Sequence, residues 1–136
     1  IMNITAHYLP NEPLDTQLQS IILKDIEFMV SESHLDLARV AIGYFFYEPD
    51  KLKDEVAQLK VQETAMHRWL NDAKADGRLA FDDVKYVVNE IDSLVKGQCF
   101  WPQLFKIEDA LSDEAKKNIA KNIVALILSR YAIESK

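Results

Sequence analysis

This sequence of 136 residues has little of what breaks or cross-links a chain: three glycines, four prolines and one cysteine. So few glycines and prolines exclude a collagen-like or low-complexity protein. The single cysteine, Cys99, excludes an internal disulfide framework and a metal site built on paired cysteines. No apolar run approaches the roughly 20 residues that a membrane-spanning helix needs. Hydrophobic residues make up 49% and charged residues 28%, so the chain can bury a core.

The length predicts one globular domain, and no signal-peptide pattern opens the sequence, so we expect a cytoplasmic protein. Because Met2 follows Ile1, we expect the natural chain to start at Met2, with Ile1 left over from expression cloning. Residues 2–136 should then form a single all-helical domain. Residues 1–10 should form a short extended lead-in to it.

Apolar residues recur at helical spacing along most of the chain, and no alternating strand pattern is present. We expect Asn11 to cap the first helix, Ser33 the second and Ser112 the last. Residues 51–76 form either one helix or two helices joined near residues 61–64. The fold class is therefore all-α, a single compact bundle of five to seven helices. The expected helices begin near residues 14, 34, 51, 82, 102 and 113, and the one that begins at 102 should run to 111.

The helix predicted over residues 34–47 is apolar around most of its circumference, which predicts a buried central helix. Only Asp36, Arg39 and Gly43 share a narrow polar arc. This arc is either a solvent-facing seam closed by an ion pair or the wall of a site.

Asp25 lies in the middle of the apolar arc of the preceding helix, where an unpaired carboxylate is costly to bury. We therefore predict that Asp25 is partly buried and forms a structural ion pair with Arg39. His34 is the second candidate partner. The alternative is an edge position, where the apolar stripe drifts around the helix.

No motif specifies a catalytic chemistry: the sequence has no nucleophile elbow and no glycine-rich phosphate loop. Glu63 and His67 would share one helical face and could chelate a metal, but no second pair of ligands accompanies them. We therefore expect no enzyme activity, no cofactor and no metal. The only basic cluster, Lys116, Lys117 and Lys121, adjoins acidic residues, so we expect no nucleic-acid partner and no membrane partner.

The acidic charge is concentrated near the beginning of the chain. Residues 1–50 carry eight acidic and two basic side chains and account for the whole net charge of −6. Such a segment repels nucleic acid and attracts basic surfaces, although a negative balance also simply keeps a protein soluble. The aromatic run from Tyr44 to Tyr47 lies directly beside Glu48 and Asp50, a composition that suits the binding of a basic protein surface.

These features together favour a small acidic interaction protein that binds and neutralises a basic partner. The specific hypothesis is an immunity or inhibitor protein for a bacterial nuclease-type toxin. The alternative is a helical enzyme or small-ligand-binding bundle that uses a slit of Asp25, Asp36 and Arg39. A transcriptional or phage regulatory protein is a third interpretation with less support. The residues expected to bind the basic partner are Glu27, Glu32, Asp36, Tyr47, Glu48 and Asp50.

Overall fold

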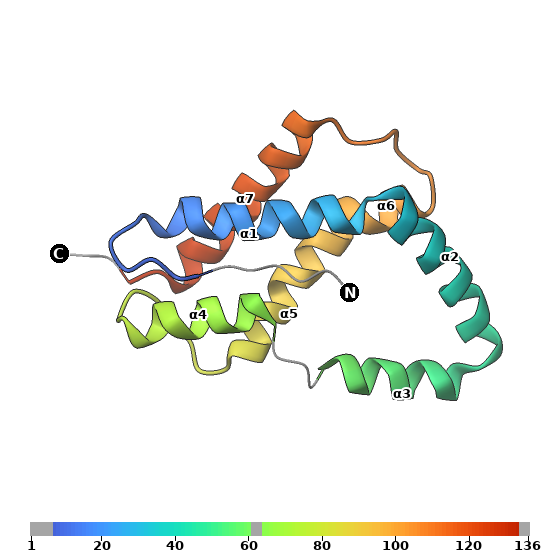
Figure 1. Ribbon diagram of the computed structural model, residues 1–136, viewed down its shortest axis with the longest axis horizontal. Helices are drawn as coiled ribbons and strands as arrows, with labels where there is room; N and C mark the ends of the chain where they lie inside the picture. The colour runs from blue at the N-terminus through green and yellow to red at the C-terminus, as the bar shows by residue number, and fades with distance from the viewer. Residues whose placement is uncertain (1–6, 61–63, 134–136) are drawn as a thin grey trace.

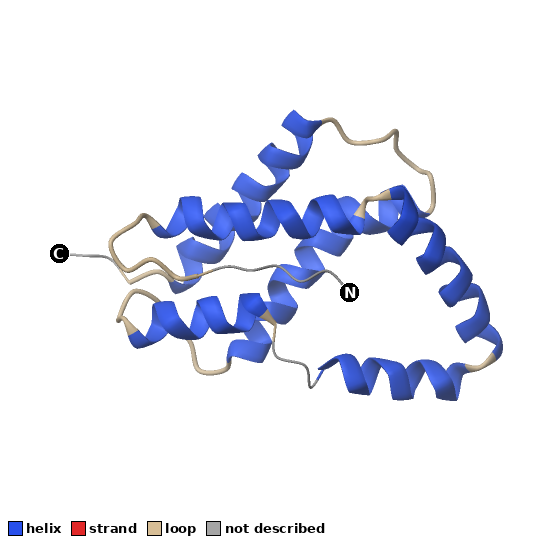
Figure 2. Cartoon of the chain, in the orientation of Figure 1, coloured by secondary structure: helices blue, strands red, loops and turns tan. Residues whose placement is uncertain are grey.

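A computed structural model describes residues 7–60 and 64–133. Within these ranges the chain is helical, apart from its loops and one isolated antiparallel bridge between Leu79 and Ala132 (Figure 2). The all-α prediction is therefore confirmed. None of the described helices is both long enough and apolar enough to cross a bilayer. The elements in chain order are α1 (Leu14–Met29), α2 (Glu32–Tyr47), α3 (Pro49–Lys60), α4 (Ala65–Ala75), α5 (Val84–Val95), the π-helical segment η1 (Lys96–Phe100), α6 (Trp101–Leu104) and α7 (Asp113–Tyr131).

The core lies among α1, α4, α5 and α7. Figure 1 shows α7 crossing α1, with α4 and the beginning of α5 beneath α1. The helical spacing predicted for α1 is confirmed, because the residues of its apolar face are buried. Burying one large aliphatic side chain contributes about 1.5–3 kcal/mol, so this face is sufficient to anchor the helix. The fully buried large side chains are Leu18, Ile22, Ile26, Trp69, Leu70, Leu79, Val87, Ile91, Val95, Cys99 and Ile123.

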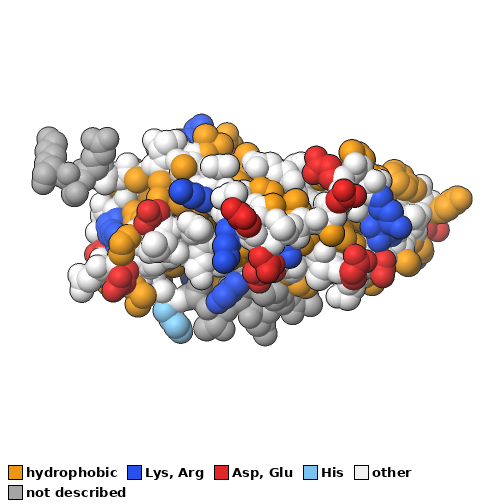
Figure 3. Space-filling view, turned by 90° about the horizontal axis from the view of Figure 1, so that it is seen from above, with side chains coloured by type: hydrophobic (Ala, Val, Ile, Leu, Met, Phe, Trp, Pro, Cys, Tyr) orange, Lys and Arg blue, Asp and Glu red, His pale blue; other side chains and the backbone are white. Residues whose placement is uncertain are grey.

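The prediction that the second helix is buried at the centre of the bundle is wrong. Figure 1 shows α2 and α3 forming an arc at one side of the molecule. Leu35 is the only buried residue of α2, and Tyr47 at its end is 89% exposed. The reason is that only one stripe of α2 finds a partner: Leu35 packs with Phe100 and Leu104 in a small second core. Apolar side chains also gather toward this end of the molecule in the surface view of Figure 3.

The helix predicted to start at Pro102 is part of a longer one. α5, η1 and α6 follow one another without a break, so the helix continues through Gly97. Trp101 donates its amide hydrogen to the carbonyl of Lys96, five residues earlier, which is the π-helical spacing. Pro102 has no amide hydrogen and therefore removes one ordinary helical bond, which favours this wider turn. The helix ends at Leu104 and not at residue 111.

The helix starts differ from the predictions in two caps. Pro13 rather than Asn11 precedes α1, without a side-chain cap, and Ser31 rather than Ser33 caps α2. The side chain of Ser112 caps α7 as predicted, accepting the amide hydrogen of Ala115 at 3.1 Å. α4 starts anew at Thr64, whose backbone is extended, so residues 51–76 contain two helices. Residues 61–63 themselves lie outside the described ranges.

Candidate functional site

The residues predicted to bind a basic partner lie on the surface of α1, α2 and the start of α3. All of them are exposed, and two of them flank the turn between α2 and α3. Nothing in their arrangement tests whether they bind a partner, so this role stays a prediction. They are Glu27, Glu32, Asp36, Tyr47, Glu48 and Asp50.

Asp25 is partly buried, as predicted, but the structure gives Arg39 other partners. Arg39 pairs with Asp36 at 3.0 Å, one turn earlier on α2. It also donates to the carbonyls of Leu104 at 3.1 Å and Gln103 at 3.2 Å. The reason is that the last carbonyls of a helix lack partners within that helix and attract a cationic donor. Asp25, Asp36 and Arg39 therefore do not form a common slit.

His34, the second partner considered for Asp25, lies between aromatic rings. Its ring centroid is 4.6 Å from that of Phe28 and 5.7 Å from that of Phe100. Burial among these rings lowers the pKa of His34, because the apolar surroundings disfavour the charged imidazolium. At neutral pH this histidine is therefore a packing residue and not a cation for Asp25.

A group of titratable side chains collects where α1 and α4 meet α5 and η1. We call Asp25, His67, Asp92 and Lys96 the α1–α5 polar cluster. All four are half-buried. Burial and, to a lesser extent, the carboxylate of Asp92 raise the pKa of Asp25 to about 6, although Lys96 opposes both effects. Burial also raises the pKa of Asp92, while Lys96 and His67 lower it.

The two carboxylates of the polar cluster lie near the ammonium group of Lys96 without forming an ion pair with it. Among the described residues, neither Asp25 nor Asp92 forms an ion pair. A half-buried charge without a direct partner destabilises the folded state. Proteins therefore keep such charges mainly where a function requires them, so the polar cluster is a candidate functional site. Sequence reasoning missed Asp92 and Lys96. Their spacing of four residues beside the apolar face of α5 was the available signal.

The remaining reactive groups near this cluster have local roles. His67 accepts the amide hydrogen of Thr64 at 3.1 Å on its Nδ1 and so completes a capping box at the start of α4. Cys99 is buried, and burial raises the pKa of its thiol to about 11, so it is an uncharged thiol at neutral pH. The predicted pair of Glu63 and His67 cannot be described, because Glu63 lies outside the described residues. No group of three metal-ligating side chains occurs within residues 7–60 and 64–133.

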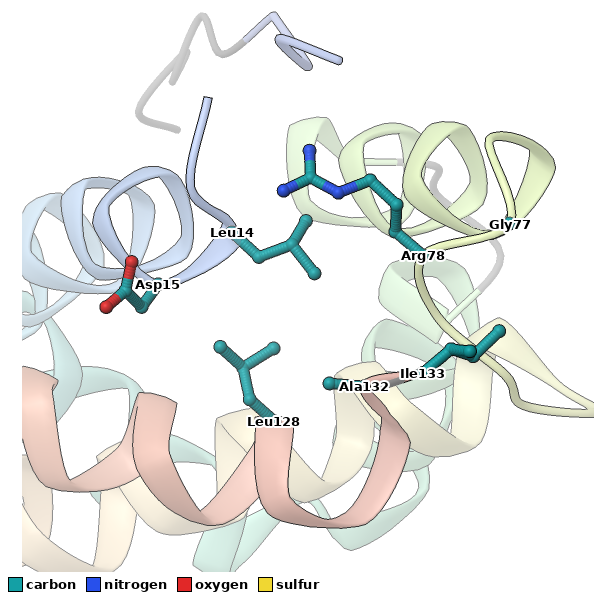
Figure 4. Close-up of a pocket in the computed structure, with 7 residues that line it drawn as sticks. All are labelled: Leu14, Asp15, Gly77, Arg78, Leu128, Ala132 and Ile133. Carbon is teal, nitrogen blue, oxygen red and sulfur yellow. The ribbon is translucent and has the colours of Figure 1, made fainter. Parts of the chain in front are cut away.

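A concave region lies at the opposite end of α1 from the polar cluster. It is an open groove of about 450 Å³ between the start of α1, the turn after α4 and the end of α7. Figure 4 shows Leu14 and Leu128 facing each other across it, with the guanidinium of Arg78 and the carboxylate of Asp15 on different sides of Leu14. The lining is mainly apolar and holds no nucleophile and no pair of carboxylates.

Comparison with known proteins places this helical domain in a regulatory family. Residues 16–133 match the family model of the AefR-like transcriptional repressor C-terminal domain. A TetR family transcriptional regulator from Pseudomonas syringae has a similar structure, with a TM-score of 0.77 and 27% identity over 94% of this chain. A TetR-family regulator from Mesorhizobium loti has the same fold, with a TM-score of 0.77 and 13% identity over 91% of this chain. No curated protein matches the sequence.

This chain spans less than two thirds of either solved regulator: 65% of the first and 62% of the second.

The matches overturn the prediction of an immunity protein that neutralises a basic nuclease toxin, and they also overturn the alternative of an enzyme or bundle built on Asp25, Asp36 and Arg39. The exclusion of a nucleic-acid partner is wrong for the same reason. It rested on the charge of this segment, whereas the family acts on transcription. An acidic surface does not by itself identify a partner. Because the match covers most of its length, the chain belongs to the family of AefR-like transcriptional repressor C-terminal domains.

Proposed function

We propose that this chain is the regulatory domain of a cytoplasmic TetR-family repressor and acts as a sensor, not as an enzyme. In the complete repressor, a small molecule held by this domain controls how tightly the protein binds operator DNA. The observation that carries this proposal is the family match over residues 16–133. The solved regulators support it, because each is longer than the region that this chain covers.

The α1–α5 polar cluster is the region best suited to hold the small molecule. Its carboxylates and its ammonium group lie beside the apolar core and are not neutralised by direct ion pairs within the described ranges. A polar ligand would supply the missing partners. Its binding energy would then act on helices that also pack against the rest of the core. A ligand shifts a conformational equilibrium only by its difference in affinity for the two states.

The ligand part of this proposal is tested by thermal unfolding of the chain in the presence of a panel of small organic acids, amines and neutral amphipathic molecules. A true ligand at 100 times its Kd stabilises the folded state by about 2.7 kcal/mol. We expect Asp92→Asn to abolish this stabilisation. Asp72→Asn, a matched change at an exposed position of α4, should leave it intact. Equal stabilisation of both variants would show that the ligand binds elsewhere.

The DNA part is tested with the complete repressor and labelled fragments of the promoter regions next to its gene. We expect fluorescence anisotropy to show binding that weakens steeply as salt rises, because phosphate contacts release counterions. A ligand identified by thermal unfolding should change the affinity at least about fivefold, the lower end of ordinary allosteric coupling. A complete protein that binds no fragment at low salt would refute the proposal.

A further inference from the structure

The segment that leads into α1, residues 8–13, is fastened to the domain in part by an arginine from the turn after α4. Arg78 donates hydrogen bonds to one hydroxyl and three backbone carbonyls of this segment, which we call the strap. Such a set of contacts fixes the path of a segment that has no regular secondary structure of its own. The acceptors are the Tyr8 hydroxyl at 3.1 Å and the carbonyls of Leu9 at 3.4 Å, Pro10 at 3.0 Å and Glu12 at 2.8 Å.

Gln17, in the first turn of α1, holds the strap from the other side. Its Nε2 donates to the carbonyls of Leu9 and Glu12, both at 3.0 Å. Its Oε1 accepts two hydrogens: the amide hydrogen of Leu9 at 2.8 Å and the indole hydrogen of Trp69 at 3.2 Å. Trp69 is only 1% exposed and belongs to the core. One amide group therefore joins the strap directly to a buried side chain of α4.

Arg78 is itself positioned by the end of α4. Its amide hydrogen bonds to the carbonyl of Ala73 at 3.0 Å, and that of Gly77 bonds to Lys74 at 2.9 Å, the pattern of a Schellman cap. Gly77 has a φ of 78°, a conformation that favours glycine. The carbonyl of Arg78 accepts the amide hydrogen of Ile133 at 3.0 Å, just beyond α7. Arg78 therefore connects the strap, α4 and the end of α7, and Figure 4 shows its side chain extending toward Leu14.

The strap is held without an ion pair. All four acceptors of Arg78 are neutral. The Tyr8 hydroxyl in turn donates a hydrogen bond to the carboxylate of Asp76 at 2.6 Å. These contacts lie mostly at the surface, where water can replace each partner when a bond opens. The strap can therefore detach while the core stays folded, as local opening does in many domains.

We propose that Arg78 and Gln17 form a latch with two states, in which the strap is held against α1 and α4 or released. The packing of Trp69 and the turn at Gly77 set the balance between these states. This inference rests on the proposed function in one respect: in the complete repressor, the latch carries the state of the ligand site to the chain on the N-terminal side of α1.

The test is amide hydrogen exchange of this chain, measured residue by residue by NMR. The strap amides that make hydrogen bonds are those of Leu9 and Glu12. We expect Arg78→Met to speed exchange at both about tenfold or more while the amides of α5 and α7 keep their rates. Arg68→Met, a matched change at an exposed position of α4, should alter neither strap amide. Unchanged exchange in Arg78→Met would overturn the latch.

Two further variants test the coupling to the core. Trp69→Phe keeps an aromatic ring but removes the indole hydrogen, and should speed exchange at Leu9 about threefold or more. Gln17→Met removes the side-chain amide that bonds both the strap and Trp69, and should speed strap exchange as Arg78→Met does. Because Gln17 lies in α1, this variant leaves the turn after α4 unchanged and tests the latch even if Arg78→Met disturbs that turn. Unchanged strap exchange in a folded Trp69→Phe protein would show that α4 does not control the latch.

The exchange experiment needs neither DNA nor ligand, so it can fail without affecting the proposed function. Conversely, a complete repressor that binds no DNA would refute the proposed function and leave the exchange result standing. In a complete repressor that responds to ligand, Arg78→Met should reduce the ligand-induced change in operator affinity at least about threefold. An unchanged response with a loosened strap would overturn the transmitting role of the latch.

Discussion

Arg39 on α2 donates its Nε hydrogen to the carbonyl of Leu104, the last residue of α6, at 3.1 Å. Its second terminal nitrogen reaches the carbonyl of Gln103 at 3.2 Å. A guanidinium at the end of a helix satisfies carbonyls that have no partner within the helix and complements the negative end of the helix dipole. Together with the packing of Leu35 on Phe100, this contact explains why α2 lies along the side of the domain.

Replacing Arg39 should therefore loosen α2 more than its ion pair alone would indicate. We expect Arg39→Met to lower the free energy of unfolding by about 1–2 kcal/mol, because hydrogen bonds from a charged donor are lost while the side chain keeps its length. Urea denaturation measures this change. Asp36→Asn removes only the exposed ion pair and should cost less than about 0.5 kcal/mol. Equal effects of the two substitutions would show that the carbonyl contacts contribute nothing.

Asp25 should make the stability of the domain depend on pH. Burial and the carboxylate of Asp92 raise its pKa from 3.8 to about 6 in the folded state. The folded state therefore binds the proton more tightly than the unfolded chain does. As a result, stability falls as pH rises between these two values, and the cost is fully present above about pH 6.

We expect Asp25→Asn to raise the free energy of unfolding by about 3 kcal/mol at pH 7.5, because it removes this buried charge. The difference from the parent protein should disappear at about pH 3, where Asp25 is mostly neutral in both the folded and the unfolded chain. Chemical denaturation at the two pH values measures the change. Asp72→Asn on the exposed face of α4 serves as the control and should have little effect at either pH. A destabilised Asp25→Asn protein at pH 7.5 would contradict the prediction.

Replacing two of the glycines by alanine, one at a time, should change the stability of the protein in opposite directions. Gly77 has a φ of 78° and open space where an alanine methyl group would lie, so Gly77→Ala costs only backbone strain, about 1–2 kcal/mol. Gly43 lies within α2, also with open space, so Gly43→Ala should stabilise the protein by about 0.5–1 kcal/mol through helix propensity. Thermal unfolding of both variants measures the difference in sign. Stabilisation by both alanines would mean that the turn after α4 does not need its left-handed residue.

Tyr131 should contribute stability through its hydroxyl. This group donates to Glu90 Oε1, and the other oxygen of Glu90 lies 3.9 Å from Arg130. Tyr131 is 8% exposed, so water replaces the lost bond poorly. We expect Tyr131→Phe to lower the free energy of unfolding by about 1–2 kcal/mol, measured by urea denaturation at pH 7. Tyr86→Phe, at a ring that is 56% exposed, should stay within about 0.5 kcal/mol of the parent. Similar values for both would argue against a structural role for the Glu90 bond.

Local pattern was sufficient for the fold class and for several elements. The apolar spacing of α1 predicted its buried face, and Ser112 predicted the start of α7, because helical periodicity and capping involve residues only a few positions apart. The same reasoning placed α2 in the core. An apolar helix surface shows that burial is favourable, but it does not show that a partner surface exists on every side. The function was mistaken for a related reason, since net charge describes a surface and not a partner.

The sequence by itself determined that this chain is helical and where most of its helices lie, because the bonds that form a helix join residues four positions apart. Only the tertiary structure decided that Asp25 lies near Asp92 rather than beside Arg39, and that Gln17 contacts Trp69. These pairs lie 67 and 52 positions apart along the chain, so their meeting depends on how α1 packs against α4 and α5. Helix packing is set by the fit of whole side-chain surfaces, which no short stretch of sequence contains.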